Sequence, residues 1–193
     1  MFHVSKRKIK MEKVSINKSI RLSQHFTLGE MTRTGTGIPN IPSRVIIENL
    51  KRLCPWLEEL RRRYNERYVF EEGGRRKEEG EYFKGREECG VRSENREEAE
   101  EPIVITSGYR SPEVNRAVGG SPTSNHLTGC AVDIRCAGVE QALRYAVILM
   151  DYADESRQDY DELLIERNKS GRYWLHFAVR PKENRRKTLF LQK

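Results

Sequence analysis

The sequence predicts an α+β fold, in which a small antiparallel sheet carries helices packed on one side within a single domain. Apolar residues recur at helical spacing between residues 46 and 64, which indicates an amphipathic helix. Runs of β-branched and apolar residues at 103–106 and 130–135 predict strands. Two more strands, 162–166 and 173–179, flank the turn sequence RNKSGR and predict a hairpin. A length of 193 residues favours one domain.

The first expected helix is short and starts at Thr27, because Thr27 and Glu30 have the spacing of a capping box. Ser43 is the expected N-cap of the amphipathic helix. Pro55 lies inside that helix and costs about 3 kcal/mol there, so we expect a kink or two separate helices. The stripe that this helix buries consists of Ile46, Leu50, Leu53, Leu57, Leu60 and Tyr64.

Two further helices are expected in the second half of the chain. Ser111 followed by Pro112 is a typical helix start, and Gly119 with Gly120 ends that helix after a few residues. Residues 139–153 predict a long helix after the second strand.

Charge is distributed unevenly along the chain. The net charge is +7, but residues 71–101 hold 12 acidic and 7 basic residues and almost no aliphatic side chains. We therefore expect 71–101 to be an exposed, flexible, charged insertion in a domain spanning 21–180. Residues 1–20 are expected to form a basic N-terminal extension, and 181–193 a basic C-terminal tail.

The composition excludes some classes of protein and leaves others open. No stretch approaches about 18 consecutive apolar residues, so we expect no membrane span. The first residues lack the apolar region of a secretory signal, so we expect a protein that is cytoplasmic as made. A basic body suits an anionic partner such as nucleic acid or a cell-wall polymer, or serves solubility alone.

The stretch SNHLTGCAVD contains a candidate metal site. His126 lies in a turn and Asp133 in the strand that follows, so a strand running back past the turn can bring the two side chains together. Imidazole and carboxylate are both good Zn²⁺ ligands. His176, beside Trp174 on one face of its strand, is the candidate third ligand, and the alternative is a structural histidine in the core.

The order of these residues resembles the zinc D-Ala-D-Ala carboxypeptidase family. These are peptidoglycan peptidases with relatives among phage endolysins, and they share a fold with the hedgehog signalling domain. The pattern H-x-x-G-x-A-x-D followed by W-x-H carries the resemblance, together with an upstream S-G-Y-R-S segment. The matching positions are His126, Gly129, Ala131, Asp133, Trp174 and His176, then Ser107, Gly108, Tyr109, Arg110 and Ser111.

The resemblance implies a zinc-dependent peptidase that hydrolyses peptidoglycan stem peptides with a zinc-activated water. His126, Asp133 and His176 would be the zinc ligands. Arg110 would hold the substrate's carboxylate or polarise the scissile carbonyl, a task suited to a guanidinium group. Substrate contacts are expected from Ser124, Tyr173 and Trp174, although a serine in a turn usually caps the turn.

The general base is the point where the sequence departs from the family pattern. Many relatives carry an acidic residue three positions before the last histidine, and here that position is Tyr173. In the predicted hairpin Glu166 lies across from Tyr173 or Trp174, so we expect Glu166 to be the base. The alternative is an exposed carboxylate at the end of a strand.

Two other functions compete with the peptidase. One is a non-catalytic zinc-containing module of the same fold that binds cell wall or protein. The other is a nucleic-acid binder, but the sequence has no recognition motif that combines aromatic and basic residues. We expect a monomeric peptidase without nucleic acid, either a carboxypeptidase that removes a terminal D-Ala or an endolysin-type endopeptidase that leaves the cell through a holin.

Overall fold

The structure is a computed structural model that describes residues 19–70 and 100–192. Most of the expected N-terminal extension (1–20) and of the expected charged insertion (71–101) lies outside the described residues. The elements in chain order are α1 (Leu28–Met31), α2 (Arg44–Tyr64), the π-helix η1 (Asn65–Phe70), β1 (Ile105–Ser107), α4 (Pro112–Ala117), the 3₁₀ turn η3 (Asn125–Thr128), β2 (Ala131–Cys136), α5 (Val139–Ser156), β3 (Glu162–Arg167), β4 (Tyr173–Ala178) and β5 (Lys187–Gln192).

The five strands form one mixed sheet in the order β1-β2-β4-β3-β5. The first four strands pair antiparallel, as predicted, and β5 pairs parallel with β3. The predicted α+β class is confirmed. Strand β5 lies in the segment 181–193, which we expected to be a basic tail. The sequence did not predict this strand, because its largely exposed residues have no alternating pattern and its pairing with β3 depends on contacts distant in the sequence.

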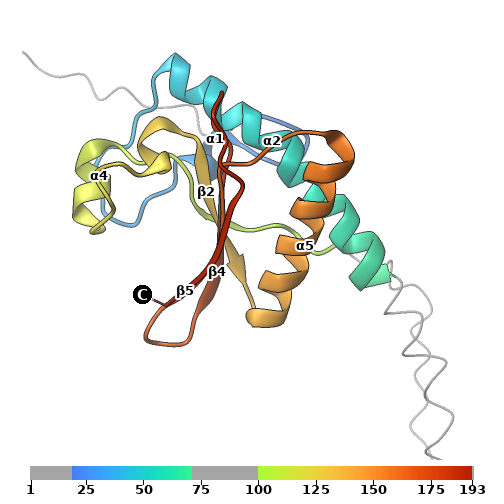
Figure 1. The fold of residues 1–193 in the computed structure, drawn as a ribbon. Coiled ribbons are helices and arrows are strands. Elements are labelled where there is room, and N and C mark those ends of the chain that lie inside the picture. Colours follow the sequence, from blue (N-terminus) through green and yellow to red (C-terminus); the bar gives the residue numbers. More distant parts are fainter. Residues whose placement is uncertain (1–18, 71–99, 193) are drawn as a thin grey trace, which may run out of the picture.

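The two faces of the sheet differ in what covers them. The long helices α2 and α5 lie on one side of the sheet, while α4 and the turn beside it lie on the other (Figure 1). Alternation along β4 directs Leu175 and Phe177 toward the long helices, where both are fully buried. Trp56 of α2 packs its ring 5.3 Å from that of Phe177. The other face carries the polar side chains discussed below.

The helix starts follow the predicted caps. Thr27 and Glu30 form the capping box, and Ser43 accepts a hydrogen bond from the Ile46 amide at the start of α2. Helix α2 continues through Pro55 as one helix, so of the two expected alternatives, a kink or two separate helices, the second was wrong. Pro55 is exposed, so its ring lies on the solvent side and water can satisfy the backbone carbonyl that it leaves unpaired. Within the described part of the chain, no helix is both long and apolar enough to cross a membrane.

Candidate metal centre

Three elements bring the predicted metal ligands together. His126 lies in η3, Asp133 in β2 and His176 in β4, where the strand register places Asp133 directly opposite His176. Gly129 ends η3 with a left-handed φ of 69°. A Cβ at this position would lie 2.8 Å from Ile46 Cγ2, so only glycine lets the turn pack against α2 and return into β2.

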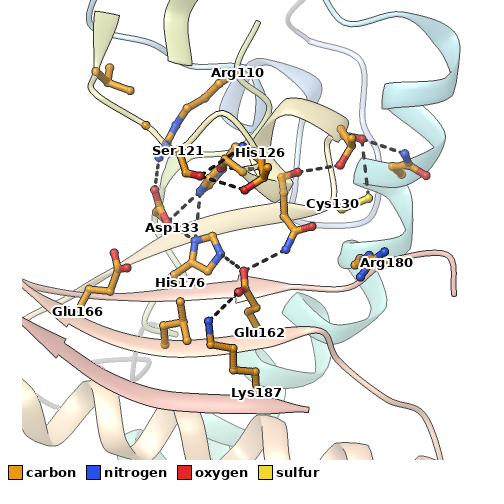
Figure 2. Close-up of a pocket in the computed structure, with 18 of the residues that line it drawn as sticks. Arg110, Ser121, His126, Cys130, Asp133, Glu162, Glu166, His176, Arg180 and Lys187 are labelled. Carbon is orange, nitrogen blue, oxygen red and sulfur yellow. Dashed lines mark hydrogen bonds and ion pairs between the residues drawn. The ribbon is translucent and has the colours of Figure 1, made fainter. Parts of the chain in front are cut away.

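The three side chains converge on one point (Figure 2). His126 Nε2 lies 3.2 Å from both Asp133 Oδ1 and His176 Nδ1. His176 Nδ1 lies 2.9 Å from Asp133 Oδ1. The three ligand atoms lie within 4.8 Å of one another, and all three residues are buried. A lone core histidine does not account for this convergence.

The second nitrogen of each imidazole has a partner of its own. His126 Nδ1 lies 2.6 Å from the carbonyl oxygen of Gly108, which can only accept, so Nδ1 carries the hydrogen and Nε2 is left to bind a metal. His176 Nε2 faces Glu162 Oε2 at 3.6 Å. Carbonyl and carboxylate are the usual partners behind a metal-bound histidine. Two imidazole nitrogens and one carboxylate therefore fit Zn²⁺.

Glycine at position 108 brings the accepting carbonyl into place. A Cβ on Gly108 would overlap the backbone carbonyl of Met31, at the end of α1. The chain on both sides is tied to its neighbours, because the Tyr109 amide donates to Met31 O and the Arg110 amide to His126 O. The turn that carries His126 is thereby fixed to the N-terminal helix.

The electrostatics of the cluster favour a cation. Burial alone would raise the pKa of Asp133, but the charges and hydrogen bonds of His126 and His176 outweigh it and keep this pKa well below its ordinary value. Burial would lower the pKa of His176, yet Asp133 and Glu162 raise it to about 9. An ionised carboxylate in a buried site attracts positive charge, whether a proton on imidazole or a metal ion.

Arg110 borders the cluster on one side. Its Nε donates to Ser107 Oγ at 2.8 Å, and one terminal nitrogen pairs with Asp133 Oδ2. Among the described residues, its other terminal nitrogen, Nη1, has no hydrogen-bond partner, and the residue lines the pocket. Arg110 Nη1 can therefore donate a hydrogen bond to an oxygen atom of the substrate.

Glu166 borders the cluster along β3. The register of the hairpin pairs Glu166 with Trp174, which was one of the two expected alternatives. The residue is only 3% exposed and lines the same pocket, so it is not an exposed carboxylate at a strand end. Figure 2 shows its carboxylate pointing toward the side of the sheet where Asp133 and His176 lie. Trp174 also lines the pocket.

Of the expected substrate contacts, Ser124 lines the pocket and Tyr173 does not. Ser124 lines the pocket, while its hydroxyl oxygen also accepts a hydrogen bond from the His126 amide at 3.3 Å. Tyr173 is not among the residues that line the pocket. Alternation places it on the helix-covered face with Leu175, and its ring lies 6.3 Å from that of Phe190. Tyr173 is thus badly placed for the predicted substrate contact.

The pocket contains polar residues that the sequence analysis did not single out. Its volume is about 1080 Å³, and Asn125, Glu162, Arg180, Arg185 and Lys187 line it together with the residues above. Glu162 could have been found by alternation, because it lies on the same face of β3 as Glu166. The basic residues come from the chain after β4, where no local pattern indicates that the chain returns to the site.

One comparison with known proteins finds a family model that matches part of the chain. Residues 86–154 match the model of the family Peptidase M15. The match confirms the resemblance found from the sequence, and it includes Arg110, His126 and Asp133. It ends before β3 and β4, so Glu166 and His176 lie outside it. A search of the curated proteins gives no match.

Proposed function

We propose, on the premise that this chain is of the zinc D-Ala-D-Ala carboxypeptidase-like Peptidase M15 family, that it is a zinc-dependent peptidase acting on peptidoglycan stem peptides. The proposal includes that it acts as a monomer. The observation that supports it most is the buried His126–Asp133–His176 cluster, which opens into a pocket beside a buried glutamate and an arginine.

The three ligand residues would hold one zinc ion. When bound there, zinc supplies a Lewis acid and lowers the pKa of a coordinated water toward neutrality. Glu166 would accept the proton of the attacking water and return it to the nitrogen of the leaving amine. Its burial suits this task, because a carboxylate shielded from bulk water keeps the proton available for the leaving group.

Arg110 would contact the substrate through Nη1, either at a carboxylate or at the scissile carbonyl oxygen. Its other nitrogens are already bound to Ser107 and Asp133, so the guanidinium group is fixed before the substrate arrives. Such preorganisation makes a hydrogen bond more effective in the transition state. Trp174 and Ser124, which line the pocket, would contact the peptide itself.

The test measures metal and products together. We would purify the protein and the His126→Ala variant, measure bound zinc, and incubate both with peptidoglycan and a pentapeptide that ends in D-Ala-D-Ala. About one zinc per chain with metal-dependent release of D-Ala identifies a carboxypeptidase. A new amine within the stem, detected by mass spectrometry, identifies an endopeptidase.

Other outcomes contradict the proposal. Zinc at one equivalent without any product indicates a non-catalytic binding module of the same fold. No bound zinc in the unmodified protein, after exposure to zinc during purification, rejects the metal site itself.

A further inference from the structure

We propose that Glu162 is a positioning residue, which orients His176 for metal binding and is itself held in place by Arg185, just before β5, and by Lys187, the first residue of β5. The inference rests on the metal site of the proposed function, but it requires no peptide turnover. According to this inference, the C-terminal segment around Arg185 and Lys187 helps to hold the ligand His176 in the orientation that binds the metal.

Strand β3 carries two glutamates in similar places. Glu162, Leu164 and Glu166 share one face of the strand, and Leu164 pairs with His176 in the register. The two carboxylates therefore flank His176 on either side, and both are in the pocket lining. Position alone does not distinguish their roles, and the role that we infer for Glu162 rests on its own contacts.

Glu162 interacts with four side chains. Its Oε2 lies 3.6 Å from His176 Nε2 and accepts a hydrogen bond from Asn125 Nδ2 at 3.0 Å. Its Oε1 lies 3.0 Å from Arg185 Nη2 and 3.4 Å from Lys187 Nζ. Figure 2 shows Glu162 between His176 and Lys187. With both oxygens engaged, this carboxylate is constrained in orientation.

The consequence for His176 follows from its two ring nitrogens. Nδ1 faces Asp133 and His126, and Nε2 faces Glu162. A metal bound at Nδ1 requires the hydrogen on Nε2, and a fixed carboxylate favours that tautomer and that ring orientation.

Glu162 also connects separate parts of the chain. Asn125, the neighbour of His126, donates to both Asp161 and Glu162, so the turn that carries one ligand is joined to β3. Arg185 binds Asp161 through two hydrogen bonds of 2.7 Å each, which anchors the segment before β5. Two ligand-bearing elements and the C-terminal segment therefore meet at this one pair of acidic residues.

The test compares variants by their affinity for Zn²⁺ alone, measured by competition with a chromophoric chelator. We expect Glu162→Ala to weaken zinc binding by roughly 10- to 100-fold, as is usual when the partner of a metal-bound histidine is lost. Glu162→Gln keeps an oxygen that can accept from Nε2, so it is expected to restore most of the affinity. Glu166→Gln is expected to leave zinc affinity unchanged while hydrolysis is lost.

The C-terminal segment is tested with a matched pair of lysines. Lys187→Ala is expected to weaken zinc binding in the same direction as Glu162→Ala, but by less, because Arg185 and Asn125 remain. Lys182→Ala removes the same charge from an exposed side chain outside the pocket, and zinc affinity is expected to stay at the unmodified value.

Three results would overturn the proposal. Unchanged zinc affinity in Glu162→Ala rules out the positioning role. Loss of hydrolysis with normal zinc binding in Glu162→Gln would make Glu162 the base instead. If Glu162→Ala does not fold, Glu162→Gln and Lys187→Ala are the test, and normal affinity in Lys187→Ala then rejects the role of the segment. An unmodified protein that binds zinc but cleaves no peptide refutes the proposed function and leaves this inference standing.

Discussion

The two faces of the sheet are built from alternate residues of the same strands, yet they differ in chemistry. Toward α2 and α5 the side chains are apolar and fully buried, as Leu175 and Phe177 of β4 show. Toward the pocket the strands present Asp133, Glu162, Glu166 and His176, of which all but Glu162 are buried. One face resembles an ordinary hydrophobic core, and the other collects ionisable groups that are usually found at the surface.

The difference indicates that the helix-covered face contributes most to the stability of the fold and that the pocket face carries the groups for activity. Burying an apolar side chain contributes about 1.5–3 kcal/mol to folding, whereas burying an unpaired charge opposes it. The pocket face is tolerated because its charges are paired, as Asp133 is with Arg110 and the two histidines. Substitutions on one face should therefore lower stability, and substitutions on the other should lower activity.

The largest expected effect is on the pocket face. Glu166→Gln keeps the size of the side chain but removes the proton acceptor, so we expect hydrolysis to fall by roughly 10²- to 10⁴-fold. The melting temperature should change little, and product release from peptidoglycan measures the loss. Glu183→Gln, an exposed position outside the pocket, is the control. Activity within a few-fold of the unmodified protein would show that Glu166 is not the base.

On the helix-covered face we expect a large loss of stability, with zinc binding retained. Phe177→Ala leaves a cavity beside Trp56, and we expect about 3–5 kcal/mol less free energy of unfolding in urea. The folded variant should still bind one zinc per chain. Phe177→Leu, which fills more of the space, should lose clearly less stability. If Phe177→Ala retained its stability but lost zinc, the separation of the two faces would be wrong.

The sequence predicted the helix-covered face better than the pocket face. Helices α2 and α5, the Ser43 cap of α2 and the β3–β4 hairpin follow from spacing and residue types that lie close together in the chain. The hairpin register also puts Glu166 opposite Trp174, because a short turn sets it locally. Alternation along β4 in turn separates Tyr173 from His176, which argues against Tyr173 as a substrate contact.

The parts that the sequence did not predict depend on distant contacts. Strand β5 is largely exposed, and its parallel pairing with β3 defines it as a strand. The role that we infer for Glu162 depends on Asn125, His176 and Lys187, which lie on three different elements. No spacing within one segment indicates such a meeting point. The candidate metal ligands could be proposed from the sequence because the order of these residue types along the chain is distinctive.

A smaller effect is expected from pH at the edge of the pocket face. Burial would raise the pKa of Asp161, but hydrogen bonds from Arg185 and Asn125 outweigh it and lower this pKa below its ordinary value. Ionised Asp161 therefore stabilises the fold above about pH 4, the range of an unfolded aspartate, and this stability is lost as pH falls through the folded pKa. Urea unfolding of the metal-free protein between pH 3 and pH 7 measures it. Asp161→Asn should show a flatter dependence on pH, and an equally steep one would contradict the assignment.

The smallest expected effect concerns the start of α2, away from the pocket. Ser43→Ala removes the side chain that accepts from the Ile46 amide, and such a loss typically costs about 1 kcal/mol of stability. Ser43→Asp replaces one capping oxygen by another and should restore most of that free energy. Because α2 packs on the apolar face, zinc affinity should be the same in all three proteins. Ile46 also contacts the turn at Gly129, so a change in zinc affinity in Ser43→Ala would show that the start of α2 and the metal centre are coupled, and that the two faces are less independent than their chemistry suggests.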